Sequence, residues 1–165
     1  MKNKRVILRI IKRKDYNKII VLLDKDITKW INPIPYPPKN KDLIDWLDFL
    51  SKANNKCFVI IEKNKANIIG MIWVENITKQ QGEIGFWIAQ KFQGKGYMKR
   101  AGNLLINYAK EKIDLRKLKA LTTNRNLASQ KTLESLGFIL KQKIKKDFKN
   151  RLGNWCDVLI YEKKL

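Results

Sequence analysis

The sequence predicts an α+β fold: a mixed, mostly antiparallel central sheet with one parallel β-α-β crossover and helices on both faces. Residues 83–89 alternate between two faces, which is the period of a strand, and from Tyr97 the apolar residues follow the period of a helix. Residues 118–123 then form another strand-like run. A strand, a helix and a strand in this order imply a right-handed parallel crossover. The apolar runs 57–62 and 68–74, joined by a polar turn, predict an antiparallel hairpin.

The first third of the chain predicts a strand at 5–11 and two helices. Asp15 is a suitable N-cap for a helix that continues to Ile27, and Asn40 begins the next helix. All four prolines fall in the segment 30–38, so this segment cannot be regular. It predicts an irregular loop, which forms either a wall over a cleft or a packed connector.

The last third predicts a helix and a final hairpin. Asn126 begins the helix and Gly137 is a good residue to end it. The hairpin is expected to pair residues 138–148 with 155–161 around a turn at Asn150 and Gly153. The predicted order of the whole chain is therefore β-α-α-β-β-β-α-β-α-β-β.

Length and composition predict one folded domain over residues 1–165. The chain is 44% apolar and 31% charged, which favours a hydrophobic core over disorder. The longest nearly apolar run, residues 68–74, is far shorter than the roughly 18 residues typical of a membrane span. A run at residues 6–11 is too short for a signal peptide, so no membrane association and a cytoplasmic location are expected.

The net charge of +21 has two interpretations. Lysine and arginine at this density attract RNA, a ribosome surface or an anionic cofactor. Alternatively, a composition rich in Lys, Asn and Ile reflects the coding bias of an AT-rich genome, with the lysines spread over solvated faces. The positive residues are dispersed along the sequence, which favours the second interpretation. The oligomeric state, monomer or homodimer, stays open.

The chain contains no histidine, and its two cysteines are far apart. Catalysis by Ser-His-Asp or Cys-His sets is therefore excluded, and no metal site is expected. Cys57 and Cys156 lie in apolar, strand-like runs and are predicted to be buried free thiols. Acid–base chemistry must use carboxylates, hydroxyls, water or the backbone.

The turn between the strand at 83–89 and the following helix has the sequence Gln93-Gly94-Lys95-Gly96. Such a turn directs free amides toward the start of the helix, which is an anion site in outline, although a simple tight β-α turn has the same composition. It does not match the dinucleotide-binding fingerprint, because Lys99 stands where the third glycine belongs. The helix is expected to bury one stripe, formed by Tyr97, Ala101, Leu104, Leu105 and Tyr108.

Five segments in order, GEIGFWI, QKFQGKGYM, NLAS, LESLGF and GNWCDVLIYEKKL, together resemble the GCN5-related N-acetyltransferases. Within that superfamily they are similar to the branch of the ribosomal-protein N-terminal acetyltransferases. The resemblance covers almost the entire chain. It implies the acyl-CoA N-acyltransferase fold, in which the strands at 83–89 and 118–123 splay apart at one end.

The resemblance also implies acetyl-CoA as the acetyl donor, with no metal. Amides of the turn from Lys91 to Gly96 would hold the pyrophosphate, and Lys91 departs from the usual Gln or Arg. The pantetheine arm would pair with the strand backbone near Phe86 to Ile88, where an amide would receive the thioester carbonyl. The residues implied in cofactor binding are Phe86, Trp87, Ile88, Phe92, Gln93, Gly94, Lys95, Gly96, Tyr97, Met98, Asn126, Ser129 and Lys131.

For catalysis the resemblance implies direct attack of an amine on the thioester. Glu83 and Asp147 are the candidates to accept the proton of the amine, with the branch favouring Asp147. Ser129 would donate to the departing thiolate. Each has a structural alternative: Asp147 as a surface charge among lysines, and Ser129 with Asn126 as a helix cap.

The acceptor implied by the branch is the N-terminal amine of a protein, ribosomal proteins included. Two alternatives remain: an enzyme of this family that acetylates a small-molecule amine such as an antibiotic, and an inactive RNA- or ribosome-binding module. Polyamines are disfavoured because a chain of charge +21 repels them.

Overall fold

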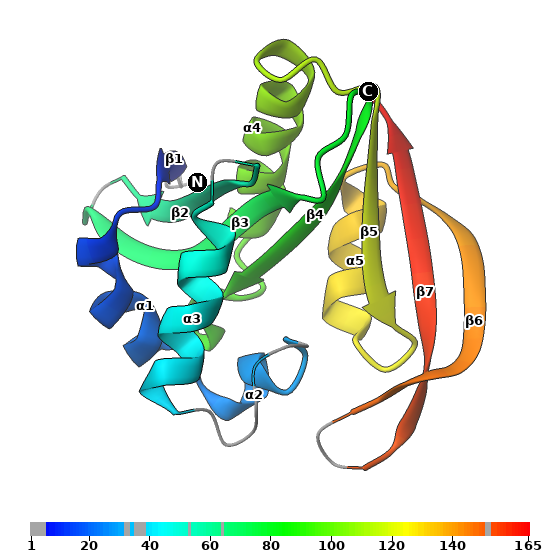
Figure 1. Ribbon diagram of the computed structural model, residues 1–165, viewed down its shortest axis with the longest axis horizontal. Coiled ribbons are helices and arrows are strands. Elements are labelled where there is room, and N and C mark those ends of the chain that lie inside the picture. The colour runs from blue at the N-terminus through cyan, green and yellow to red at the C-terminus, as the bar shows by residue number, and fades with distance from the viewer. Residues whose placement is uncertain (1–5, 32–33, 35–38, 53, 64, 151–152) are drawn as a thin grey trace.

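The computed structural model describes residues 6–31, 34, 39–52, 54–63, 65–150 and 153–165. Within these residues seven strands form one sheet in the order β1-β2-β3-β4-β5-β7-β6 (Figure 1). Only β4 and β5 pair in parallel, and every other neighbouring pair is antiparallel. The predicted mixed sheet with one parallel crossover is confirmed. The strands are β1 Val6–Ile10, β2 Lys56–Glu62, β3 Asn67–Glu75, β4 Gln81–Ile88, β5 Lys117–Thr123, β6 Ile139–Lys149 and β7 Trp155–Lys164.

Helices cover both faces of this sheet, as predicted, and each face has its own apolar cluster. The strands alternate between them: Phe58 and Ile60 of β2 join the cluster under α4 and α5, while Val59 and Ile61 join the cluster under α1, α2 and α3. Cys57 and Cys156 are buried and free, also as predicted. The helices are α1 Tyr16–Leu22, α2 Lys25–Thr28, α3 Asn40–Leu50, α4 Tyr97–Glu111 and α5 Leu127–Ser135.

The prediction of one helix over residues 15–27 was wrong. The helix breaks after α1, where Leu23 takes a non-helical conformation with ψ of 84°. Asp24 then begins α2, because its carboxylate accepts hydrogen bonds from the amides of Asp26 at 2.9 Å and Ile27 at 3.0 Å. An Asp side chain competes with helical hydrogen bonding in this way and favours a new start. The break gives α2 its own direction.

Asp15 also has a role other than the predicted one. It stands at the N-cap position of α1, but its side chain makes no capping bond to that helix. Its carboxylate instead accepts from the guanidinium of Arg9 at 2.9 and 2.8 Å and from the amide of Lys12 at 2.8 Å. The hydrogen bonds from Arg9 lower the pKa of Asp15. This buried pair ties β1 to the start of α1.

The buried stripe of α4 is rotated from the predicted one. Ala101, Leu105 and Ala109 are fully buried at its centre, whereas Leu104 is 42% exposed. Gly102 lies inside the stripe, because the side chain of Leu136 packs against the position that a Cβ would occupy there. Close packing of α5 on α4 therefore sets the rotation. None of the helices in the described residues is long and apolar enough to cross a membrane.

We expect Asp15→Asn to lower the free energy of unfolding by about 2 kcal/mol at neutral pH, because a buried charged hydrogen bond to Arg9 is lost. The pKa of Asp15 is lower in the folded state than in the unfolded state, so this stabilisation is present above the ordinary pKa of Asp. It disappears as the pH falls through the lowered value. Urea unfolding at several pH values measures both effects.

The matched control is Asp26→Asn. Asp26 makes an ion pair with Lys29 at 2.8 Å, but its side chain is 45% exposed. Exposed pairs stabilise little, so the control should lose much less stability than Asp15→Asn. Equal losses in the two variants would contradict the role given to the Arg9–Asp15 pair.

Candidate active site

A cleft of about 1240 Å³ opens where β4 and β5 separate. The two strands share only three parallel residue pairs, the last of which joins Glu83 to Lys119. Beyond that pair β4 continues to Ile88 and β5 to Thr123 without pairing to each other. Figure 1 shows the strands close together at one end and apart at the other. The splayed strands implied by the sequence are confirmed.

The unpaired edge of β4 faces this cleft and is linked to the glycine turn. The amide of Ala89 donates to the carbonyl of Ile69 in β3 at 2.9 Å, which uses the other edge of β4. On the cleft side, the carbonyl of Ile88 accepts from Nε2 of Gln93 at 3.1 Å. The Gln93 side chain therefore holds the turn against the strand. Phe86 packs on the α4 and α5 side, and Trp87 points to the opposite face.

Two glycines of the turn before α4 take a left-handed backbone conformation. Gly94 and Gly96 have φ of +68° and +74°, values that favour glycine over residues with a Cβ. A Cβ at either residue would meet no atom within 4 Å, so open space lies beside the turn. Gly96 is the N-cap of α4 and offers no side chain to its first amides. These amides at a helix N-terminus can bind an anion.

Lys95 is the one predicted cofactor-binding residue that does not line the cleft. Its ammonium donates to the carbonyl of Lys91 at 2.6 Å and lies 5.9 Å from the centre of the Phe92 ring. The side chain thus folds back on its own turn. Two lysines of the neighbouring helices do line the cleft: Lys99 of α4 and Lys131 of α5.

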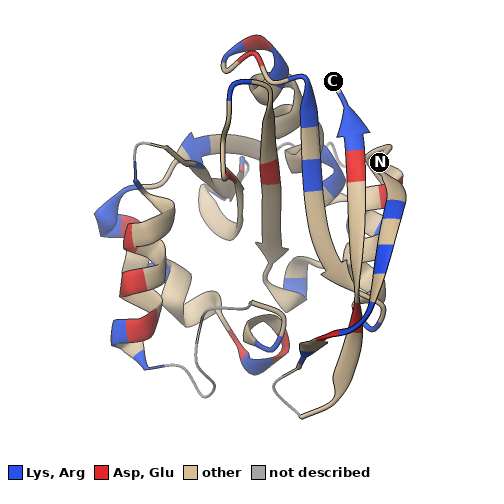
Figure 2. Ribbon diagram, turned by 45° about the vertical axis from the view of Figure 1, so that its right-hand side comes forward, with Lys and Arg blue, Asp and Glu red and all other residues tan. Residues whose placement is uncertain are grey.

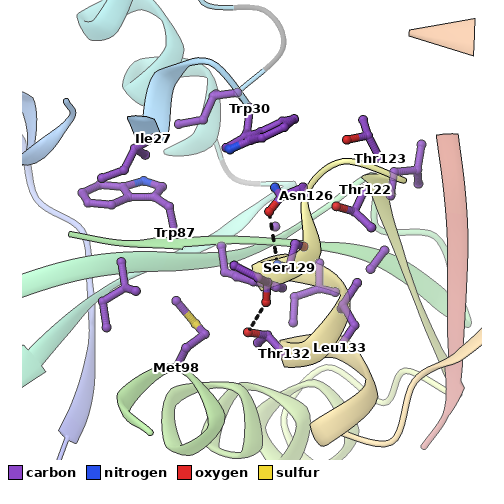
Figure 3. A pocket seen from close by; sticks show the side chains of 18 of the residues that line it. Ile27, Trp30, Trp87, Met98, Thr122, Thr123, Asn126, Ser129, Thr132 and Leu133 are labelled. Atoms are coloured by element: carbon purple, nitrogen blue, oxygen red, sulfur yellow. Dashed lines mark hydrogen bonds between the residues drawn. The ribbon is translucent and has the colours of Figure 1, made fainter. Parts of the chain in front are cut away.

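The N-terminus of α5 forms the wall opposite β4 (Figure 3). Asn126 is its N-cap, as predicted, and Oδ1 accepts from the amide of Ser129 at 3.2 Å. Ser129 is half-buried and lines the cleft, and its hydroxyl has no hydrogen-bond partner in the described part of the chain. Beside them, the buried hydroxyls of Thr122 and Thr123 also have no partner among the described residues. No sequence pattern marked these two threonines, which end β5 and lie three and four residues before the Asn126 cap.

Carboxylates border the other side of the cleft. Glu75 and Glu83 stand opposite each other in the antiparallel β3–β4 pair. Nε1 of Trp73 donates to Glu75 at 2.9 Å, and the side-chain amide of Asn76 donates to Glu83 at 3.4 Å. Burial raises the pKa of Glu83, and the nearby charge of Glu75 adds to this, while Asn76 opposes it. Asp147 lines the cleft from β6, where it is exposed.

Aromatic residues that the sequence analysis did not assign to the site complete this side. Trp46 of α3 and Trp73 of β3 make an edge-to-face contact with ring centres 5.7 Å apart. From the segment 30–38, Trp30 and Ile31 line the cleft, while residues 32–33 and 35–38 lie outside the described residues. The distance along the chain between these residues explains why no sequence pattern united them.

The cleft thus has two chemically different halves. One half offers free helix amides, lysines and hydroxyls, which suit a phosphate-bearing ligand with a polar arm. The other offers carboxylates and indole rings, which suit a cationic amine. Every sequence-predicted site residue except Lys95 lines the cleft, including Glu83, Ser129 and Asp147. Among the described residues no group of three or more potential metal-ligating side chains comes together.

Comparison with known proteins gives a consistent picture. Residues 5–139 match the family described as the acetyltransferase (GNAT) domain. An uncharacterised N-acetyltransferase of Bacillus licheniformis, p20, is 30% identical over 145 residues, which span 84% of this chain and 80% of the relative. YdaF of Bacillus subtilis (strain 168), named as a candidate ribosomal N-acetyltransferase, is 27% identical over 150 residues, 83% of this chain and 79% of its own.

The fold agrees with that of a solved enzyme. The crystal structure of spermidine N-acetyltransferase from Vibrio cholerae, in complex with CoA and spermine, superposes with a TM-score of 0.84 at 21% identity. The match covers 96% of this chain and 95% of that one. The family match over residues 5–139, the relative at 30% identity and the splayed sheet lead to one conclusion: the chain belongs to the GNAT family of acetyltransferases and is an N-acetyltransferase.

Proposed function

We propose that this N-acetyltransferase uses acetyl-CoA as its donor and transfers the acetyl group directly to a primary amine within the cleft. The observation that carries the proposal is the separation of β4 from β5 after three residue pairs. It leaves one strand edge free between a glycine turn and a helix N-terminus. The chain has no histidine, which suits a reaction without a protein nucleophile.

The chemistry of the residues in the half with the helix amides supports acetyl-CoA as the donor. Amides around Gly94 and Gly96 would bind the diphosphate, and Lys99 and Lys131 would add positive charge. The backbone of Phe86 and Ile88 would pair with the pantetheine arm. Acetyl-CoA supplies the activated thioester, and the protein supplies position and charge.

Two groups would manage protons. The Ser129 hydroxyl, with no partner in the described residues, can donate to the sulfur that leaves as CoA. Glu83 would accept the proton of the attacking amine, directly or through water, because its raised pKa makes it a stronger base than an ordinary glutamate. Asp147 is the second candidate, since it also borders the cleft. Burial favours Glu83 for this role.

For the acceptor we propose the N-terminal amine of a protein, in line with the relative named as a candidate ribosomal N-acetyltransferase. Carboxylates that line the cleft, among them Glu75 and Glu83, would attract a protonated amine despite the net charge of +21. The local charge of the cleft therefore differs in sign from that of the whole chain. The same carboxylates would attract a small diamine.

An RNA- or ribosome-binding role is the second candidate, because lysines gather on the strands β5, β6 and β7 (Figure 2). Edge strands also carry lysines to prevent pairing with other chains, so this pattern has a structural explanation too. RNA affinity that falls steeply with salt, without any binding of acetyl-CoA, would favour the binding module. The lysines of β6 are Lys141, Lys143, Lys145, Lys146 and Lys149.

Gly96→Val should weaken acetyl-CoA binding about tenfold or more in isothermal titration calorimetry, since the side chain would fill the open space beside the amides. Gly153→Val is the matched control: Gly153 has φ of +80°, also has open space around it, and does not line the cleft. It carries the same backbone strain. Equal affinity in both variants would remove this turn from the site, and no binding by the wild type would remove the proposed donor.

Ser129→Ala should lower kcat by about 10- to 100-fold with little change in acetyl-CoA affinity, because the hydroxyl acts on the developing thiolate. Ser135→Ala serves as the control on the same helix, since Ser135 also lines the cleft but its hydroxyl already donates to the carbonyl of Thr132 at 2.8 Å. Steady-state kinetics with calorimetry separates the two effects. A loss confined to affinity would make Ser129 a binding residue only.

Glu83→Gln should lower kcat/KM by about 100-fold and abolish the acidic limb of the pH profile, which is the decline of kcat/KM toward low pH. In the wild type this limb should rise with pH through a pKa above the ordinary range of glutamate, since only the ionised carboxylate accepts a proton. The pH profiles of Glu83→Gln and of Asp147→Asn provide the measurement. A larger loss in Asp147→Asn, with the acidic limb retained in Glu83→Gln, would transfer the role to Asp147.

A further inference from the structure

Trp87 carries an indole N–H that has no hydrogen-bond partner in the described part of the chain. Its side chain is 6% exposed and lines the cleft. An indole nitrogen can only donate, and a buried donor without an acceptor is unfavourable. Figure 3 shows the ring on the side of the cleft formed by Ile27 and Trp30. The donor is therefore free to bind a ligand atom that enters there.

The contrast with Trp73 makes the free donor significant. Trp73 lies on the same face of the sheet, in β3, and its indole packs against Gly85 of the neighbouring strand. Its own N–H donates to Glu75 at 2.9 Å. The fold thus pairs the indole N–H of Trp73 and leaves that of Trp87 without a partner among the described residues. Packing on this face therefore does not by itself explain why the indole N–H of Trp87 lacks an acceptor.

The face on which Trp87 lies identifies the kind of ligand. Phe86 and Ile88, its neighbours in β4, pack on the side of α4 and α5, where the glycine turn and Ser129 are found. Trp87 belongs to the cluster on the other face, with Ile27 of α2. The donor half of the cleft and the Trp87 ring are therefore on opposite sides of the strand. A ligand of the Trp87 N–H would therefore lie on the side of β4 away from the glycine turn and Ser129, where the amine acceptor would approach.

We propose that Trp87 selects acceptors that carry a carbonyl oxygen next to the reacting amine, as the first residue of a peptide does. The inference rests on the proposed acetyl transfer and narrows its acceptor class. The first peptide carbonyl would accept the indole hydrogen bond, and Glu83, four residues away on the same face of β4, would reach the α-amine through water. A protonated alkyl diamine offers only donors and cannot make this contact. The carboxylates of the cleft would attract protonated peptides and diamines alike, so Trp87 would be the residue that distinguishes these two classes of acceptor.

The test pairs a change in the acceptor with a change in the enzyme. A panel of tripeptide amides with different first residues identifies a good acceptor, which is then compared with its isostere bearing an (E)-alkene in place of the first peptide bond. The isostere keeps the shape and removes the carbonyl. Rates are expressed per concentration of unprotonated amine. Trp87→Phe removes the N–H and keeps an aromatic ring.

The wild type should prefer the peptide over the alkene isostere by about 10- to 100-fold in kcat/KM. In Trp87→Phe the ratio of the two kcat/KM values should fall toward one, because the peptide carbonyl and the indole N–H are the two partners of one hydrogen bond. Thermal shift with acetyl-CoA establishes that the variant is folded. The wild-type preference is measured without any variant, so the inference stays testable even if Trp87→Phe does not fold.

Three results would overturn the inference while leaving acetyl transfer intact: no preference in the wild type, an equal loss on both compounds in Trp87→Phe, or acetylation of 1,4-diaminobutane but of no peptide. The second result would give Trp87 a packing role. If neither the peptides, the isostere nor the diamine is acetylated, the proposed function itself fails, and the inference fails with it.

Discussion

The short parallel contact between β4 and β5 is the constraint on which the site depends. Three residue pairs, ending at Glu83 and Lys119, hold the strands together at one end, and the right-handed crossover through α4 fixes their direction. Beyond this point the backbone N–H and C=O groups on the facing edges of β4 and β5 do not pair with each other. Unpaired backbone polar groups need partners. The fold thus provides a strand edge for a ligand in the middle of its sheet, between the N-termini of α4 and α5.

The two faces of the sheet also differ chemically where they border the cleft. One face, under α4 and α5, carries the free amides, the lysines and the hydroxyls. The other, under α1, α2 and α3, carries the paired glutamates and the indoles. Glu75 and Glu83 face each other at a cost in repulsion, which the hydrogen bonds from Trp73 and Asn76 reduce. An acidic border in a strongly basic chain raises the local concentration of cations beside it.

Side chains around the glycine turn hold its backbone in place. Gln93 holds the turn to Ile88, and Lys95 folds back on Lys91. The turn therefore depends on two glycines in a left-handed conformation and on the start of α4.

The sequence by itself determined the fold class, the crossover, the glycine turn, the Asn126 cap and the two buried thiols, because each depends on short-range periodicity or on one residue type. Only the tertiary structure decided the break between α1 and α2, the outward position of Leu104 and the folding back of Lys95. It also decided that Glu75 meets Glu83, that Trp46 meets Trp73, and that Trp87 keeps a free donor. These features depend on strand register and on helices packed from distant parts of the chain, and such long-range contacts leave no periodic signal in a single sequence.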